Sequence, residues 1–210
     1  MSWLGGIDLA GLLGRFHARY PEVIIRLATA ASGDGSLGLI ESLTDGRLDA
    51  AFVSVPGPAP VGTRFTDLLS VPLDLVVPTD HRLSGRAEVS VSELAGEAFI
   101  DFPVGYGNRT VADLAFRSAG ISRDVSIEIT AVPAGADFVR NGLGIALLPR
   151  GTADAYDDVS ALHVTSADLT WPVRLATPTG RVPSAAARAL HDLIRDRYPH
   201  RPRNPVPTDA

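Results

Sequence analysis

Residues 22–55 read EVIIRLATAASGDGSLGLIESLTDGRLDAAFVSV, and the interpretation of the whole chain starts from this stretch. Its first part, residues 23–27, is an apolar, β-branched run that predicts a buried strand. Leucine and isoleucine then recur at helical spacing over residues 37–43, and Gly46 ends that helix. Residues 50–55 predict a second strand. Strand, helix and strand together predict a βαβ unit within a mainly parallel sheet.

Composition excludes several classes of protein. The 210 residues are 45% hydrophobic, enough for the core of one large domain or two small ones. A formal net charge of −5 argues against a surface dedicated to nucleic acid. All 19 residues counted as Lys or Arg are Arg, which excludes Schiff-base, PLP and P-loop chemistry. Without cysteine there is no thiol catalysis, thiolate metal site or disulfide.

The N-terminal sequence and the length of the apolar runs predict where in the cell the protein lies. No apolar run approaches the roughly 20 residues that a membrane span needs, so we expect no membrane partner. The N-terminus lacks a basic region followed by an apolar core, so we expect no signal peptide. Together with the absence of cysteine, these features predict a cytoplasmic protein.

The rest of the chain predicts further strands and helices. Further helices are expected at 8–20, 91–95 (one turn), 109–118, 133–141 and 184–198; strands are expected at 65–77 (two segments broken at Pro72), 98–102, 125–129, 145–148, 161–164 and 172–177. We expect the 109–118 helix to turn Val111, Leu114 and Ala115 inward.

These elements predict two α/β subdomains. Residues 3–78 plus 174–198 would form subdomain I, residues 79–173 subdomain II, and the proline-rich residues 199–210 a disordered tail. The chain would then cross twice between the subdomains. Such an arrangement is typical of proteins that bind a ligand in the cleft between two lobes.

One candidate site lies at residues 33–38, which read GDGSLG and match G-x-G-x-x-G at the start of a helix. The acidic residue expected at the end of the following strand is missing, because that end reads Ser54, Val55 and Pro56. A nicotinamide or flavin site, a loop without a ligand, and a modest ligand contact through backbone N–H groups and Ser36 stay open as alternatives.

A second candidate site lies at residues 106–109, which follow a strand and open a helix. Arg109 can pair bidentately with a carboxylate or phosphate, and Tyr106 can stack on a ring. The alternative is a surface arginine, although a cation in a first helical turn opposes the helix dipole. The joints at residues 54–56 and 131–135 carry small residues that leave room for a ligand or simply pack.

Metal and catalytic motifs are not evident. The five histidines do not cluster at metal-binding spacing, and Ser36 lacks the G-x-S-x-G surroundings of a nucleophile. We therefore predict no metal, no cofactor and no enzymatic activity.

Four segments resemble the effector-binding domain of LysR-type transcriptional regulators. In this chain they are residues 16–23 (F-x-x-R-Y-P-x-V), 46–52 (G-R-L-D-A-A-F), 77–83 (V-P-T-D-H-R-L, with Arg82 where the family has proline) and 139–149 (V-x-x-G-L-G-I-A-L-L-P). Their order and spacing match the family, and the resemblance covers roughly residues 3–198.

The resemblance implies a type II periplasmic-binding-protein-like fold, with two α/β subdomains joined by a double crossover. It implies that a small effector binds in the interlobe cleft and shifts a DNA-bound oligomer between states. By position, the effector-binding residues would be Trp3, Gly35, Ser36, Ser54, Phe102, Tyr106, Asn108, Arg109, Val132 and Pro133.

The resemblance also implies partners. The chain would form a homodimer or tetramer in which the 8–20 helix faces the 109–118 helix of a partner. The family's winged helix-turn-helix and first core strand would precede Trp3, so the chain itself should not bind DNA specifically.

We therefore expect a sensor of a small anionic metabolite, with Arg109 favouring a carboxylate. Two alternatives stay open. The first is a solute-binding protein of a transport system, which would be exported. The second is a nucleotide-dependent oxidoreductase that uses residues 33–38.

Overall fold

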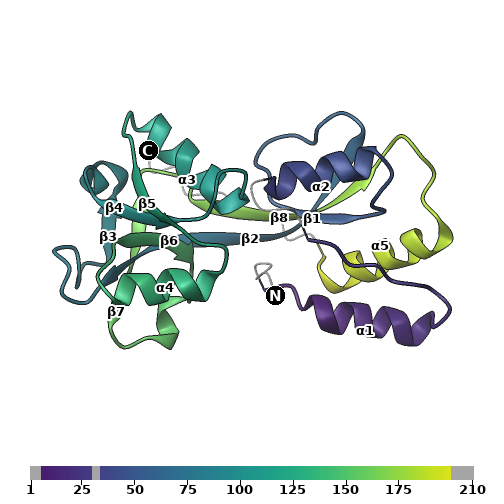
Figure 1. The fold of residues 1–210 in the computed structure, drawn as a ribbon, viewed down its shortest axis with the longest axis horizontal. Helices are drawn as coiled ribbons and strands as arrows, with labels where there is room; N and C mark the ends of the chain where they lie inside the picture. The colour runs from purple at the N-terminus through teal and green to yellow at the C-terminus, as the bar shows by residue number, and fades with distance from the viewer. Residues whose placement is uncertain (1–5, 30–33, 200–210) are drawn as a thin grey trace, which may run out of the picture.

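A computed structural model describes residues 6–29 and 34–199, and Figure 1 shows them arranged in two lobes. The long strands β2 (Thr63–Pro78) and β8 (Thr170–Pro178) run between the lobes. The first lobe holds α1 (Leu9–Arg19), α2 (Gly35–Thr44), β1 (Ala51–Val53) and α5 (Ala185–Arg197). The second lobe holds β3 (Glu88–Ser90), η1 (Val91–Leu94), β4 (Ala98–Asp101), α3 (Gly107–Ser118), β5 (Asp124–Glu128), α4 (Val132–Arg140), β6 (Ile145–Pro149), η2 (Ala153–Ala155) and β7 (Val159–Thr165).

One hydrogen-bonded sheet connects the lobes. The strand order is β1-β8-β2-β6-β4-β5, with β7 on β2 and β3 on β7. Residues 63–72 of β2 pair with β8, whereas residues 73–78 pair with β6 and β7. Since β2 and β8 run unbroken through both lobes, the predicted boundaries of 3–78 plus 174–198 and 79–173 stay a prediction.

Local sequence signals explain the two helices that pack together in the first lobe. Asp8 caps α1, since its Oδ1 accepts from Gly11 N at 2.9 Å, and Leu12 and Phe16 are buried beneath it. Ser184 caps α5 in the same way, with Ala187 N donating to its Oγ at 3.1 Å. Each of these two helices thus has the N-cap and the apolar face that the sequence predicts.

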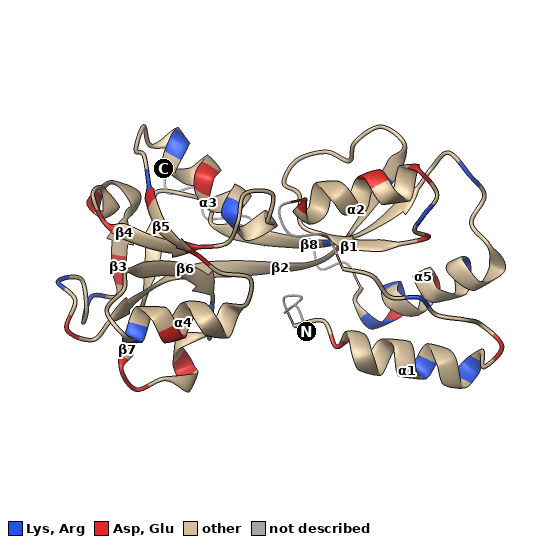
Figure 2. Ribbon diagram, in the orientation of Figure 1, with Lys and Arg blue, Asp and Glu red and all other residues tan. Residues whose placement is uncertain are grey.

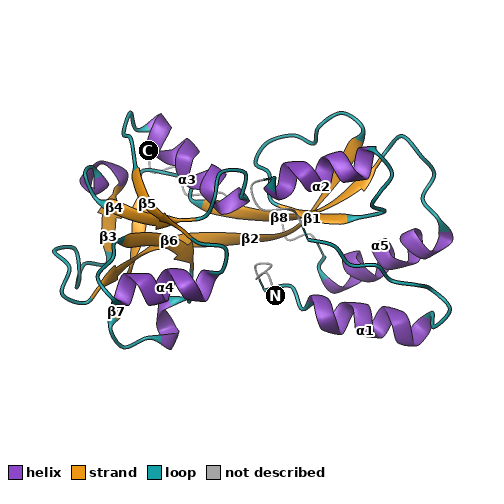
Figure 3. Cartoon of the chain, viewed as in Figure 1, coloured by secondary structure: helices purple, strands orange, loops and turns teal. Residues whose placement is uncertain are grey.

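The buried strand predicted at residues 23–27 is wrong. These residues form no strand; the side chain of Ile24 is 81% exposed and that of Leu27 is 68% exposed. Figure 3 shows loop from the end of α1 through these residues. The reason is the lack of a neighbour: among the described residues β1 pairs with β8 alone, and a strand needs a partner for its backbone groups. The predicted βαβ unit therefore does not form.

The prediction of a mainly parallel sheet is also wrong. Strand β2 is antiparallel to β6, β7 and β8, and β1 is antiparallel to β8. Parallel pairing is confined to the second lobe, where β4 pairs with β5 and β6, and β3 with β7. The two long strands that join the lobes impose the antiparallel pattern.

Two local predictions differ from the structure. Pro72 does not break the 65–77 segment, because it is the last β2 residue paired with β8 and lies where β2 changes partner; a missing N–H is tolerated there. Leu114 is 42% exposed, whereas Val111 and Ala115 are buried. The inner face of α3 continues instead through Ala112 and Phe116, at helical spacing.

Other predictions fall on residues outside the described ones. Trp3, Gly33 of the predicted 33–38 motif, and all but Pro199 of the predicted tail at 199–210 lie there. The remaining predicted helices and strands are confirmed within a few residues at their ends.

Candidate functional site

Two of the predicted ligand loops meet where the lobes touch. Ser36, in the first turn of α2, donates its N–H to the carbonyl of Gly105 in the second lobe at 3.4 Å. The Oγ of Ser36 also accepts from Ser54 N, just after β1, at 2.9 Å. Ser36 therefore joins three segments that are far apart in the sequence.

Glycines allow this close approach of the lobes. A Cβ added to Gly35, whose φ is +48°, would lie 2.1 Å from the carbonyl oxygen of Gly105. A Cβ added to Gly107 would lie 2.0 Å from Ser54 Oγ. Both distances are far below van der Waals contact, so no side chain fits at either position without moving the lobes apart.

The electrostatics of this contact favour an anion. Helix α2 begins at Gly35 and α3 begins at Gly107, so two helix N-termini from different lobes lie beside Ser54. The free N–H groups of a helix N-terminus carry partial positive charge. Ser54 is 8% exposed, and its buried Oγ has no hydrogen-bond partner among the described residues. The site therefore offers an unused hydroxyl between two anion-binding helix ends.

Apolar and aromatic candidates lie on the second-lobe side of this contact. The rings of Phe102 and Tyr106 are 5.9 Å apart and tilted by 31°, and Phe102 is buried. Asn108 is buried in the first turn of α3. Val132 packs in the same hydrophobic cluster as Phe102, whereas its neighbour Pro133 is exposed at the start of α4.

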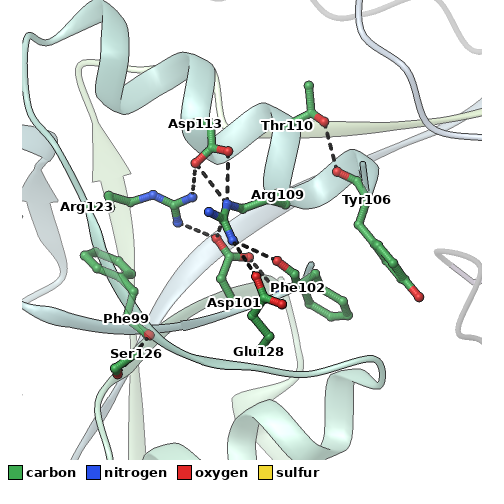
Figure 4. A network of polar contacts seen from close by, with 10 residues as sticks. All are labelled: Phe99, Asp101, Phe102, Tyr106, Arg109, Thr110, Asp113, Arg123, Ser126 and Glu128. Atoms are coloured by element: carbon green, nitrogen blue, oxygen red, sulfur yellow. Dashed lines mark hydrogen bonds and ion pairs between the residues drawn. The ribbon is translucent and has the colours of Figure 1, made fainter. Parts of the chain in front are cut away.

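Arg109 does not stand free at the cleft. Its Nε donates to Asp113 Oδ1 and Oδ2 at 3.1 and 3.0 Å, and its Nη1 donates to the carbonyl of Phe102 at 3.0 Å. Glu128 lies 3.7 Å from Nη1. Figure 4 shows these contacts, and Figure 2 shows basic, acidic and basic residues in turn along α3. The predicted contact between Arg109 and an effector carboxylate stays a prediction.

Two residues that adjoin this site, Arg123 and Asp101, carry no motif in the sequence. Arg123 and Asp101 have side chains that are each 3% exposed and form an ion pair, and Arg123 also donates to Asp113. Burial raises the pKa of the Asp101 carboxyl, while Arg123, the Phe102 N–H and Arg109 oppose that rise. The available signal was the charge of Asp101, the next-to-last residue of the predicted 98–102 strand, because a charge at a buried strand end needs a partner.

Within residues 6–29 and 34–199, no group of three histidine, aspartate or glutamate side chains is placed to hold a metal ion. None of the helices in those ranges is long and apolar enough to cross a membrane.

Known proteins with the same fold identify the class. The regulatory domain of Synechocystis PCC6803 CcmR, in complex with 2-PG, matches with a TM-score of 0.75 and 21% identity over 91% of each chain. The effector-binding domain of QuiR, in complex with shikimate, matches with a TM-score of 0.76 and 19% identity, over 93% of this chain and 92% of that one. The structure is thus of the type II periplasmic-binding-protein-like class, as the sequence predicts.

Sequence comparison then gives the family. The family model of the LysR substrate binding domain matches residues 2–199, so the chain belongs to that family. The HTH-type transcriptional regulator YybE of Bacillus subtilis (strain 168) is 31% identical over 204 residues, covering 93% of this chain and 65% of YybE. The chain therefore spans about two thirds of this relative's length. The family is one of transcriptional regulators, and the findings do not favour a transport protein or an oxidoreductase.

Proposed function

We propose that this domain binds a small anionic effector between its lobes and so controls a transcriptional regulator. The observation that carries the proposal is the Ser54 hydroxyl, which lies between the N-termini of α2 and α3 and has no hydrogen-bond partner among the described residues. A carboxylate or phosphate placed there would accept from Ser54 and from the helix N–H groups. The ligands 2-PG and shikimate in the CcmR and QuiR domains support a small effector in this fold.

Within this proposal each candidate residue has a defined task. Ser36, Ser54 and Asn108 provide polar contacts, and Gly35 leaves room for the ligand. Phe102 and Tyr106 form the wall on the second-lobe side, while Trp3, Val132 and Pro133 complete the site. Arg109 adds positive charge in the first turn of α3. The lobes must separate slightly to admit a ligand, because Gly35 and Gly107 already touch the opposite lobe.

The proposal extends to the whole regulator. We infer a non-enzymatic, cytoplasmic protein that works as a homodimer or tetramer, with α1 of one subunit facing α3 of another. Contact with DNA is assigned to a helix-turn-helix part of the regulator, by analogy with the HTH-type relative YybE. Ligand binding would bias the lobes between two arrangements and thereby the oligomer on DNA.

A thermal-shift screen tests the effector site. The panel contains shikimate, benzoate, 2-phosphoglycolate, amino acids and NAD(P)H. A compound at 100 times its Kd should add about 2.7 kcal/mol to the free energy of unfolding. We expect a carboxylate or phosphate to give this shift, and Ser54→Ala to weaken its binding about 10-fold or more, as loss of a hydrogen bond to a charged group predicts.

The matched control is Ser160→Ala on β7, which removes a serine hydroxyl far from the site. In the wild type this hydroxyl lies 3.0 Å from Ser84 Oγ. It should leave the shift unchanged. A hit that Ser54→Ala does not weaken would contradict the proposed site. A shift with NAD(P)H alone would favour the oxidoreductase instead.

A further inference from the structure

We propose that Arg123 and Asp101 are positioning residues for the effector loop, defined as residues 102–106, although both side chains lie behind it. The inference rests on the proposed function, because it explains how that site keeps its shape. Figure 4 shows the two side chains on one side of the loop and the Tyr106 ring pointing away from them.

Asp101 holds the beginning of the effector loop. Its Oδ1 accepts from the N–H of Phe102 at 2.7 Å, and its Oδ2 accepts from Arg123 Nη1. The carboxylate is therefore fixed by a buried cation while it orients the first peptide group of the loop. Loss of either partner would leave Asp101 free to turn.

Arg109 holds the other backbone group of the same residue, the carbonyl of Phe102. Its Nη1 donates to the carbonyl of Phe102, while its Nε is held by Asp113. Arg123 Nη2 also donates to Asp113. Both backbone groups of Phe102 are thus fixed, its N–H by Asp101 and its carbonyl by Arg109. The guanidinium of Arg123 binds both Asp101 and Asp113, the carboxylate that holds Arg109.

The surroundings of Arg123 argue for positioning rather than for stability. Its side chain is 3% exposed, and its guanidinium carbon lies 5.3 Å from the ring of Phe99 and 5.1 Å from that of Phe116. The Nε is buried without a hydrogen-bond partner among the described residues. Burying such a charge network costs as much as it contributes, and apolar residues often serve stability equally well. What this network supplies is a defined geometry.

That geometry reaches the contact between the lobes. Beyond Phe102 the loop forms a turn, in which Tyr106 N donates to Pro103 O at 3.2 Å. Gly105 O, within this turn, accepts from Ser36 N. The loop has one fixed end at the Asp101 network and one at α2. A shift of Phe102 would therefore move Gly105 relative to Ser36 and change the space available to the effector.

Amide hydrogen exchange on the unliganded chain tests this inference independently of any ligand. In Arg123→Lys, which keeps the charge but has a single donor group, we expect exchange at Tyr106 and Ser36 to accelerate at least 10-fold. Leu73, whose N–H donates to Leu169 O at 2.8 Å, reports on the rest of the structure and should change much less. Arg123→Met also destabilises the whole fold, so it should accelerate Leu73 together with Tyr106 and Ser36.

Arg150→Met is the matched control, because Arg150 pairs with Asp74 through two bonds of 2.9 Å in the same lobe without contacting the loop. It should leave Tyr106 and Ser36 unchanged. If Arg123→Lys does not fold, Asp101→Asn decides, with the same local acceleration expected. Equal acceleration at Leu73 in Arg123→Lys would reduce Arg123 to a structural residue, and unchanged exchange at Tyr106 and Ser36 would overturn the inference.

A binding measurement connects the inference to the proposed site. If the wild type binds shikimate, Arg123→Lys should bind it about 10-fold more weakly and Arg150→Met equally well, by calorimetric titration. Equal affinity in Arg123→Lys would contradict positioning. Failure of the wild type to bind any acid would instead count against the proposed function and leave the exchange result valid.

Discussion

The two lobes stabilise their charged residues and their backbones differently. In the second lobe Asp101 and Arg123 form a pair with both side chains 3% exposed, and every strand is paired. In the first lobe the pair of Arg181 and Asp49 is 40% and 68% exposed, and residues 23–27 lie outside the sheet. At the contact between the lobes, the second lobe thus contributes a loop of defined shape. The first lobe contributes the N-terminus of α2 and has fewer paired strands behind it.

The largest expected effect separates the two ion pairs. Arg123→Met leaves Asp101 buried without its main partner and should lower the free energy of unfolding by about 3–5 kcal/mol. Arg181→Met removes half of a solvent-exposed pair and should cost at most about 1 kcal/mol. Urea unfolding of both variants measures the difference. Equal losses would show that the lobes do not differ in this respect.

A matched pair of leucine substitutions tests the difference in packing. Leu148→Ala on β6 empties a site that is 1% exposed and should cost about 2–5 kcal/mol. Leu27→Ala removes the same atoms from a side chain that is 68% exposed and should change stability by no more than about 0.5 kcal/mol. A loss of several kcal/mol in Leu27→Ala would mean that residues 23–27 form a buried strand in solution, as the sequence predicts.

The buried carboxyl of the second lobe should make stability depend on pH. Burial raises the pKa of Asp101 above its ordinary 3.8, so the folded state keeps this proton to higher pH than the unfolded state. Between 3.8 and the raised value, the contribution of Asp101 to stability therefore falls as the pH rises. Asp101→Asn should lack this loss. Unfolding curves measured across that pH range test this. If the free energies of unfolding of wild type and Asp101→Asn changed with pH in parallel, the raised pKa would be contradicted.

His191 gives the first lobe a dependence of the opposite sign. Burial lowers the pKa of His191 below 6.5, with Arg195 assisting and the hydrogen bond to the Asp49 backbone opposing. Since the unfolded state binds the proton more readily, the contribution is complete above pH 6.5 and is lost as the pH falls toward the lowered value. We expect His191→Gln to lose less stability on this acidification than wild type, by thermal melts between pH 7 and 5. An equal loss would contradict the prediction.

Local signals predicted most elements of both lobes. Asp8 and Ser184 precede regular apolar spacing and cap α1 and α5, and glycines end several of the predicted helices. The resemblance assigned Ser36 and Ser54 to the same effector cleft, and in the structure Ser54 N donates to Ser36 Oγ. These signals succeed because a cap or an apolar face depends on residues three or four positions apart.

The failures concern partners that are distant in the sequence. The run at 23–27 has the composition of a strand, yet strand formation depends on a neighbour to pair with. Arg109 has the residue type and the position expected of a ligand-binding residue, yet Asp113 and the Phe102 carbonyl occupy its donors. Arg123 carried no motif at all, and only its position between Phe99 and Phe116 makes it notable.

The sequence by itself therefore determined the family, the helices and the joints from which the candidate site is built. Tertiary structure alone decided which strands pair, which arginine is buried, and that Gly105 meets Ser36 across the lobes. The physical reason is range: helical periodicity and capping are local, whereas backbone pairing and the burial of charge depend on groups that the fold brings together from far along the chain.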